Sequence, residues 1–243
     1  MRITGDKIEI DYNKTKEFYV DRARKYDSDS PYISVLFQDD HPEIATGRNH
    51  AETTKILPKL NLTKQSRVLD IGCGVGRWAD ALPEDIAYYL GVDFSADMIA
   101  IAKQRNQRTQ FYFENISAME CQAYCESHNL QKFTHVIISA MMLYINDEDV
   151  KKIMQCASAV TGQNAILYVA DSMGIKERLT LKDIYSEELK HEYNSIYRTP
   201  DEYRDFLTTY APEFQIYEHA PLYEEAKLNN RKETAQYYFL LKR

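Results

Sequence analysis

The stretch that decides the fold is RVLDIGCGVGRW, residues 67–78. It is an apolar run that contains an acid, Asp70, and then turns through alternate glycines at Gly72, Gly74 and Gly76. Glycines at such a turn let the backbone approach a ligand closely, because side chains there would block the approach. A dinucleotide-binding turn has the spacing G-x-G-x-x-G and offers a helix N-terminus to a pyrophosphate. The G-x-G-x-G spacing and the preceding acid disfavour that ligand and favour a cationic group.

A second acid stands at the tip of the next strand-like run, in GVDFSADM, residues 91–98. Asp93 at this tip can accept hydrogen bonds from both hydroxyls of a ribose. The two acids therefore indicate a ligand with a ribose and a cationic tail, and S-adenosylmethionine has both. The alternatives are an ordinary tight strand-to-helix connection and a nicotinamide-binding turn.

Strand-like and helix-like runs alternate from residue 67 onward, which is typical of a parallel sheet with crossover helices. The segments before residue 67 are expected to be mainly helical, at about 15–26 and 42–60. The charged, tyrosine-rich segment 171–198 is also expected to be helical, and a Thr199–Glu202 capping box predicts a helix start. The strand-like runs are RVLDIG, AYYLGVD, QFYFE, FTHVIIS, AILYVAD, FQIYEHA and AQYYFLLK.

We expect an α/β fold in a single domain, with a seven-stranded, mostly parallel sheet and helices on both faces. The chain has 243 residues, of which 44% are hydrophobic, so a normal core can be buried. The expected parts are an N-terminal helical cap (1–62), a cofactor-binding core (63–171), an acceptor-side helical insertion (172–212) and a final strand pair (213–243).

Charge and composition exclude several functions. The formal net charge of -7 lacks the basic footprint of a nucleic-acid binder, so no such partner is expected. A polar N-terminus and a longest apolar run of only Val136–Ile145 predict a cytoplasmic protein without a signal peptide or membrane span. Cys121, Cys125 and His128 resemble a partial metal site, but no further ligand pair lies nearby, so we expect buried thiols and no metal.

VLDIGCGVGRW followed by LGVDFSADMI resembles the first two motifs of the class I, Rossmann-like S-adenosylmethionine-dependent methyltransferases. The resemblance covers the strand order from about residue 67 to the C-terminus, including a last strand that enters antiparallel. It implies S-adenosyl-L-methionine as cofactor and a set of residues around it. These are Asp70, Gly72, Gly74 and Gly76 at the methionine part, Asp93 at the ribose, Phe94, Met98, Asn115 and Ile116 at the adenine, and Ser139 at the methionine end.

The N-terminal segment resembles the lid of small-molecule methyltransferases, in which a tyrosine and an arginine contact the methionine end of the cofactor. Tyr26, Arg22 and Arg48 are the candidates. An arginine can bind the cofactor carboxylate with two hydrogen bonds, and a tyrosine face suits the sulfonium. The alternative is an amphipathic helix whose tyrosines pack on the core.

The later segment, with its RLTL, YSEEL and YNSIYRT runs, resembles an insertion in methyltransferases of bacterial surface-polysaccharide and natural-product clusters. Arginines together with tyrosine hydroxyls would suit an acceptor that bears a phosphate or a carboxylate. The alternative is that Arg178 and Arg198 neutralise neighbouring acids on a surface helix. The residues expected to face the acceptor are Tyr144, Arg178, Tyr193, Asn194 and Arg198.

Many small-molecule members of this family carry a histidine just after the fourth strand, but here Leu143 stands at that place. A base must therefore come from the two coverings, where His41 and His191 lie, or from the phenolate of Tyr197. An acceptor acidic enough to need no base is the alternative.

The expected function is O-methylation of a small molecule, a sugar or phosphosugar intermediate of polysaccharide biosynthesis. Within enzymes, the alternative is N-methylation of an amino sugar or another natural-product amine. A cofactor-binding regulatory protein that no longer transfers methyl groups is the alternative from another class, and a nicotinamide oxidoreductase is the third.

Overall fold

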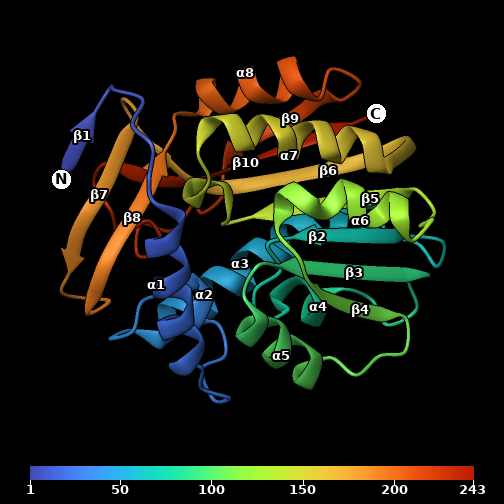
Figure 1. The fold of residues 1–243 in the computed structure, drawn as a ribbon, viewed down its shortest axis with the longest axis horizontal. Helices are drawn as coiled ribbons and strands as arrows, with labels where there is room; N and C mark the ends of the chain where they lie inside the picture. Colours follow the sequence, from blue (N-terminus) through green and yellow to red (C-terminus); the bar gives the residue numbers. More distant parts are fainter.

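The fold is seen in a computed structural model that describes residues 1–243, and its centre is a seven-stranded sheet (Figure 1). Its strands are β2 (Arg67–Ile71), β3 (Tyr88–Asp93), β4 (Phe111–Asn115), β5 (Phe133–Ser139), β6 (Thr161–Gly174), β9 (Gln215–Pro221) and β10 (Thr234–Lys242). They lie in the order β4-β3-β2-β5-β6-β10-β9. The first five are parallel, and β10 enters antiparallel between β6 and β9. All seven predicted strands are confirmed.

Helices cover both faces of this sheet, as predicted. Neighbouring residues of β2 point to opposite faces: Val68 packs with α3, α4 and α5, whereas Leu69 packs with α6, α7 and α8. In Figure 1, α7 and α8 lie together on one side of the sheet. The bounds are α3 (Pro42–Leu60), α4 (Arg77–Ala81), α5 (Ala96–Arg105), α6 (Cys121–Ser127), α7 (Asp147–Val160) and α8 (Pro200–Tyr210), with two short 3-10 turns, η1 (Ala118–Glu120) and η2 (Met142–Tyr144).

The strand order reverses at β2, because the chain continues to β3 on one side and later returns to β5 on the other. In open parallel sheets, such a reversal leaves a crevice at the carboxyl ends of the two strands, where ligands bind. The glycine turn that follows β2 lies at this crevice. The sheet topology therefore determines where the site can be.

The expectation of a helical segment at 171–198 is wrong. β7 (Leu179–Ser186) and β8 (His191–Tyr197) form an antiparallel hairpin, and β1 (Arg2–Thr4) adds a third strand beside β7. Thr180, Ile184 and Ile196 favour strands because their side chains branch at Cβ. The many charged residues between them obscure the alternation along the chain.

The N-terminal cap is helical as predicted, with α1 (Tyr12–Arg24) and α2 (Ile33–Leu36) preceding α3. It is joined to the hairpin, which lies beside α1 in Figure 1. Phe18 of α1 meets the ring of Tyr193 of β8 with centroids 5.5 Å apart. The Asn146 side chain exchanges two hydrogen bonds with the backbone of Ile10, at 2.9 and 3.1 Å. The cap, the hairpin and the start of α7 are thus one packed unit.

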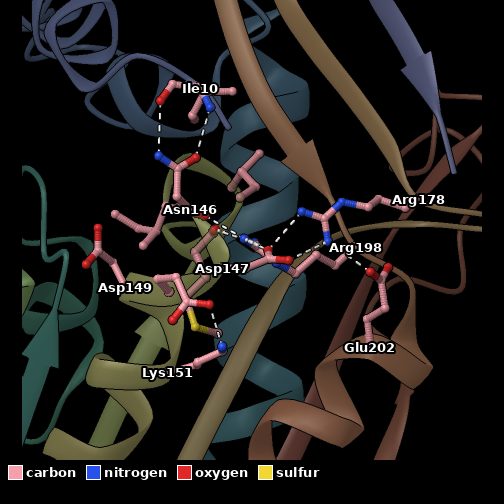
Figure 2. Close-up of polar contacts among 12 residues, drawn as sticks. Ile10, Asn146, Asp147, Asp149, Lys151, Arg178, Arg198 and Glu202 are labelled. Carbon is pink, nitrogen blue, oxygen red and sulfur yellow. Dashed lines mark hydrogen bonds and ion pairs between the residues drawn. The ribbon is translucent and has the colours of Figure 1, made fainter. Parts of the chain in front are cut away.

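An ion cluster centred on Asp147 joins the hairpin to the core (Figure 2). The Asp147 carboxylate accepts from Arg178 Nη2 at 2.8 Å and from Arg198 Nη2 at 2.7 Å. Arg198 also donates to the carbonyl oxygens of Met142 and Ile145, at 2.8 and 2.6 Å. The hairpin register pairs Leu179 with Tyr197, which brings the two arginines side by side.

The four cysteines are buried free thiols, as predicted. Cys121, Cys125 and Cys156 lie in the core cluster beneath α6 and α7. None of the helices combines the length and apolar character required to cross a bilayer.

We predict that Arg198→Ala lowers the free energy of unfolding by about 2–4 kcal/mol, because it removes a fully buried guanidinium that donates to Asp147 and to two backbone carbonyls. The matched control is Arg204→Ala, since Arg204 pairs with Asp201 on the exposed surface of α8 and should cost less than about 1 kcal/mol. Urea unfolding followed by circular dichroism measures both values. Equal losses in the two variants would contradict a structural role for Arg198.

Candidate functional site

A cavity of about 350 Å³ opens at the carboxyl ends of β2 and β3. We name it the glycine-loop cavity. Most of the residues that the sequence assigned to the cofactor line it: Asp70, Gly72, Gly74, Asp93, Phe94, Asn115, Ile116 and Ser139.

The glycine turn has a backbone that only glycine adopts readily. Gly72 and Gly74 have φ values of 79° and 51°, in the left-handed region. A Cβ atom on Gly72 would lie 2.5 Å from Met141, and one on Gly74 would lie 2.8 Å from Val35. The turn is held in place by Val92, whose carbonyl accepts from the Gly72 N–H at 2.8 Å. The close approach expected from the sequence is therefore present.

Asp93 links the glycine turn to the tip of β3. Its carboxylate accepts from the Gly74 N–H at 3.0 Å and from the Ser95 N–H at 2.9 Å. Burial raises the pKa of Asp93 to about 6, although these two backbone hydrogen bonds oppose the rise. Asn115 lies opposite Asp93 in the register and donates to its carbonyl oxygen at 3.0 Å.

Asp70 is buried at the floor of the cavity, where it accepts a hydrogen bond from the Tyr89 hydroxyl at 2.7 Å. Burial raises the pKa of Asp70 to about 7, and the Tyr89 hydrogen bond and the charge of Arg77 counteract part of that rise. Two carboxylates with raised pKa values therefore line one end of this cavity. Such groups favour a ligand that brings positive charge and hydroxyl donors.

Two predicted lid arginines are structural. Arg22 is fully buried and donates to Asp39 at 2.6 Å and to the backbone carbonyls of Ser34 and Ile33. Arg48 donates to the Leu228 carbonyl and to the Asn230 side-chain oxygen, and it does not line the glycine-loop cavity. Both hold loops together, which corrects their assignment to the cofactor carboxylate.

Three further candidates lie behind the wall of the cavity instead of lining it. Gly76 caps α4 and faces Asn106 and Phe113. Met98 is buried in a small apolar cluster beneath α1, and the Tyr26 hydroxyl accepts a hydrogen bond from Arg105 at 3.2 Å. They support the turn and the cap from outside.

Two residues that the sequence interpretation missed, Arg77 and Trp78, do line the cavity. The buried indole N–H of Trp78 has no hydrogen-bond partner, and Arg77 keeps its Nε–H free of protein partners. Donors left free beside a cavity fit the carboxylate of an amino-acid ligand. Their position directly after Gly76 was the available signal.

A second cavity of about 330 Å³, the hairpin cavity, lies between β7, β8 and residues 222–236. Tyr193 and Tyr197 contribute to its wall, together with apolar side chains of the hairpin. The two cavities meet, because five residues line both: Val35, Leu36, Ser139, Ala140 and Tyr144.

The tyrosines of the hairpin cavity form a hydroxyl chain. The Tyr144 and Tyr193 hydroxyls lie 2.9 Å apart, and Tyr197 donates to Tyr193 at 3.4 Å. Burial raises the pKa values of Tyr144 and Tyr193 well above the usual value of a phenol. These two side chains are therefore neutral donors at physiological pH and cannot serve as phenolate bases.

The remaining predicted acceptor residues do not face the cavity. Arg178 and Arg198 belong to the Asp147 cluster, and the Asn194 side chain accepts from the Asp183 N–H at 2.9 Å inside the hairpin. The assignment of these three residues to the acceptor is wrong, because tertiary contacts use their polar atoms.

Both histidine candidates lie outside the two cavities. His41 caps α3 at the surface, with its ring 3.3 Å from Glu43. His191 begins β8 and places its ring against Phe18, with a hydrogen-bond contact of 2.8 Å to the carbonyl oxygen of Glu192. Neither histidine is positioned to take a proton from a bound molecule.

A buried polar group that no sequence pattern indicated stands at the meeting of the cavities. Glu52 forms an ion pair with Arg77 at 2.8 Å. The same carboxylate accepts from the hydroxyls of Ser139 at 2.7 Å and Tyr168 at 2.8 Å. Glu52 lines the hairpin cavity, Arg77 lines the glycine-loop cavity, and Ser139 lines both.

Comparison with known proteins agrees with this geometry. Residues 68–164 match a family described as a methyltransferase domain. The demethylmenaquinone methyltransferase of Oceanobacillus iheyensis is 33% identical over 89 residues, which are 35% of this chain and 33% of that protein. The chain thus spans about a third of the length of this curated relative.

Solved structures share the fold over nearly the whole chain. Phosphoethanolamine N-methyltransferase 1 of Haemonchus contortus, in complex with phosphoethanolamine and S-adenosylhomocysteine, superposes with a TM-score of 0.69 at 17% identity, covering 95% of this chain and 48% of that chain. Magnesium protoporphyrin IX methyltransferase from Synechocystis, with bound S-adenosylmethionine, gives a TM-score of 0.62 at 16% identity, covering 98% and 99%. At these identities the likeness establishes the fold.

The strand order, the glycine turn and the matched domain lead to the same conclusion. The chain has the class I, Rossmann-like methyltransferase fold, its residues 68–164 match a methyltransferase domain, and the solved structures that share the fold hold S-adenosylmethionine or S-adenosylhomocysteine.

Proposed function

We propose that the chain transfers a methyl group from S-adenosylmethionine in the glycine-loop cavity to a small molecule in the hairpin cavity. The observation that carries this proposal is the wall that the two cavities share at Ser139, Ala140 and Tyr144. Methyl transfer requires the donor carbon and the acceptor atom to meet in line, and positioning supplies much of the catalysis. Two adjoining cavities meet that requirement.

In this proposal, the residues of the first cavity hold the parts of the cofactor. Asp93 accepts the ribose hydroxyls, Asp70 attracts the cationic amino-acid part, and Arg77 and Trp78 bind its carboxylate. Phe94, Asn115 and Ile116 surround the adenine. Bound there, the cofactor supplies an electrophilic methyl group on a positively charged sulfur.

The acceptor in this proposal is a sugar or phosphosugar methylated at oxygen. The tyrosine rings of the hairpin cavity suit the faces of a sugar ring, and their hydroxyls suit its polar edge. Lys232 is exposed in the wall of this cavity and suits a phosphate, in place of the structural Arg178 and Arg198, whereas the neighbouring Arg231 pairs with Glu188. The resemblance of the RLTL–YNSIYRT segment supports a role in cytoplasmic polysaccharide biosynthesis.

N-methylation of an amine is the second candidate, and Glu52 favours it. A buried carboxylate in the wall of the hairpin cavity can accept a hydrogen bond from an amine. The Haemonchus contortus enzyme, which has the same fold, was solved with phosphoethanolamine, an amine that carries a phosphate.

We predict that the protein forms S-adenosylhomocysteine with at least one of four probes: glucose 6-phosphate, glucosamine 6-phosphate, UDP-glucose and phosphoethanolamine. Product mass and NMR then distinguish an O-methyl from an N-methyl group. A protein that binds S-adenosylmethionine but methylates none of the probes would support the regulatory alternative.

Asp93→Ala should weaken S-adenosylhomocysteine binding by about tenfold or more, since hydrogen bonds to a charged group contribute roughly 1.5–3 kcal/mol. Calorimetry measures this affinity, and Asp97→Ala, an exposed acid four residues along the chain, is the matched control. Unchanged affinity in Asp93→Ala would remove the ribose assignment.

Cofactor affinity should also depend on pH. The folded-state pKa values of Asp70 and Asp93 are about 7 and 6, so both carboxylates lose their charge as the pH falls through this range. Because the bound state uses the charged forms, affinity should fall by up to roughly tenfold per pH unit and per group below these values. Asp70→Asn should remove the part of this pH dependence that lies near pH 7. A cofactor affinity of the wild type that does not change with pH would contradict the role of the two carboxylates.

A further inference from the structure

The wall between the two cavities contains a hydroxyl with one unused acceptor position. The Ser139 hydroxyl donates to Glu52 Oε1 at 2.7 Å and accepts from Arg77 Nη2 at 3.0 Å. A serine hydroxyl has one donor and two lone pairs, so one lone pair remains free. Because Ser139 lines both cavities, this lone pair is available to an acceptor molecule at the point where methyl transfer would occur.

Glu52 is the buried carboxylate connected to this point. Its charge is stabilised by the ion pair with Arg77, which offsets the cost of burial. The other acids around the cavities are placed differently: Asp70, Asp93 and Glu120 line only the glycine-loop cavity, and Glu233 is exposed and paired with Arg2. The tyrosine hydroxyl chain beside the wall ends in no basic group.

We propose that Ser139 and Glu52 together remove the proton of the methyl acceptor, with Ser139 as the group in contact and Glu52 as the positioning residue behind it. This inference rests on the proposed function. The acceptor oxygen or nitrogen forms the new bond to the methyl carbon, while the carbon–sulfur bond breaks and leaves its electron pair on sulfur. The acceptor proton moves to Ser139 Oγ, and the Ser139 proton moves to the Glu52 carboxylate, from which water later removes it.

A relay through Ser139 and Glu52 requires no histidine after β5. Leu143 occupies that place, and the two candidate histidines lie outside both cavities. Ser139 ends β5 and Glu52 comes from α3, so the sheet and the cap each contribute one member of the pair.

The test compares a nucleophile that carries a proton with one that carries none. Protic probes are the four molecules named above, and iodide is the aprotic probe, since its methylation requires no proton removal. Ser139→Ala and Glu52→Gln should slow methylation of the protic probe by about 10- to 100-fold, within the range of general-base effects. Iodide methylation by the same variant should fall at least about tenfold less than methylation of the protic probe, so that any effect of the substitution on cofactor binding through Arg77 is common to both rates.

Tyr168→Phe is the matched control, because Tyr168 donates to the same Glu52 oxygen but lines neither cavity. It should slow the protic probe by far less than Ser139→Ala does. Glu52→Gln can fail to fold because Arg77 loses its partner. In that case Ser139→Ala alone tests the proton relay, since it keeps the Arg77–Glu52 ion pair.

The pH profile provides a second readout. With a hydroxyl acceptor, whose nucleophilic group does not gain a proton in this range, the ratio of protic to iodide rates at saturating cofactor should fall at low pH in the wild type and be flat in Glu52→Gln, because effects on the cofactor cancel in the ratio. Equal losses with both nucleophiles, or a Tyr168→Phe loss as large as that of Ser139→Ala, would overturn the inference. A wild type that methylates iodide but no protic probe would also overturn it, whereas one that methylates neither would overturn the proposed function itself.

Discussion

The structure depends on one ion cluster, in which the half-buried Asp147 holds the buried Arg178 and Arg198. Asp147 begins α7 in the core, whereas the two arginines flank the ends of the hairpin strands. Charges in such a place are costly unless every one is paired, so the hairpin has a single position relative to the sheet. That position forms a wall of the hairpin cavity.

A second buried ion pair, between Arg77 and Glu52, joins the glycine turn to the cap. Arg77 follows the glycine turn, and Glu52 lies in the cap, so their contact joins the turn to α3. Ser139 completes the group from the end of β5. Three distant segments therefore meet at the wall between the cavities, and the polarity of that wall follows from their packing. The two ion pairs together place a donor cavity and an acceptor cavity side by side.

Local patterns were enough to predict much of this protein. The seven strands, the helix starts at Ser95 and Thr199 and the cofactor turn are short-range features, in which neighbouring residues carry the signal. Predictions failed where a residue's partner is far away in the chain. Arg198 was assigned to the acceptor, yet it lies 51 residues from the carboxylate that binds it. The hairpin was mistaken for helix because its charged residues hide the alternation.

The sequence by itself determined the donor side: the strand order, the glycine turn after β2 and the acids Asp70 and Asp93 at two strand tips. These follow from backbone geometry and hydrophobic alternation, which act over a few residues. Only the tertiary structure decided which arginines are structural, where the second cavity lies and which carboxylate stands at the shared wall. Glu52 and Ser139 are 87 positions apart, and only the packing of α3 against β5 brings them within hydrogen-bond distance.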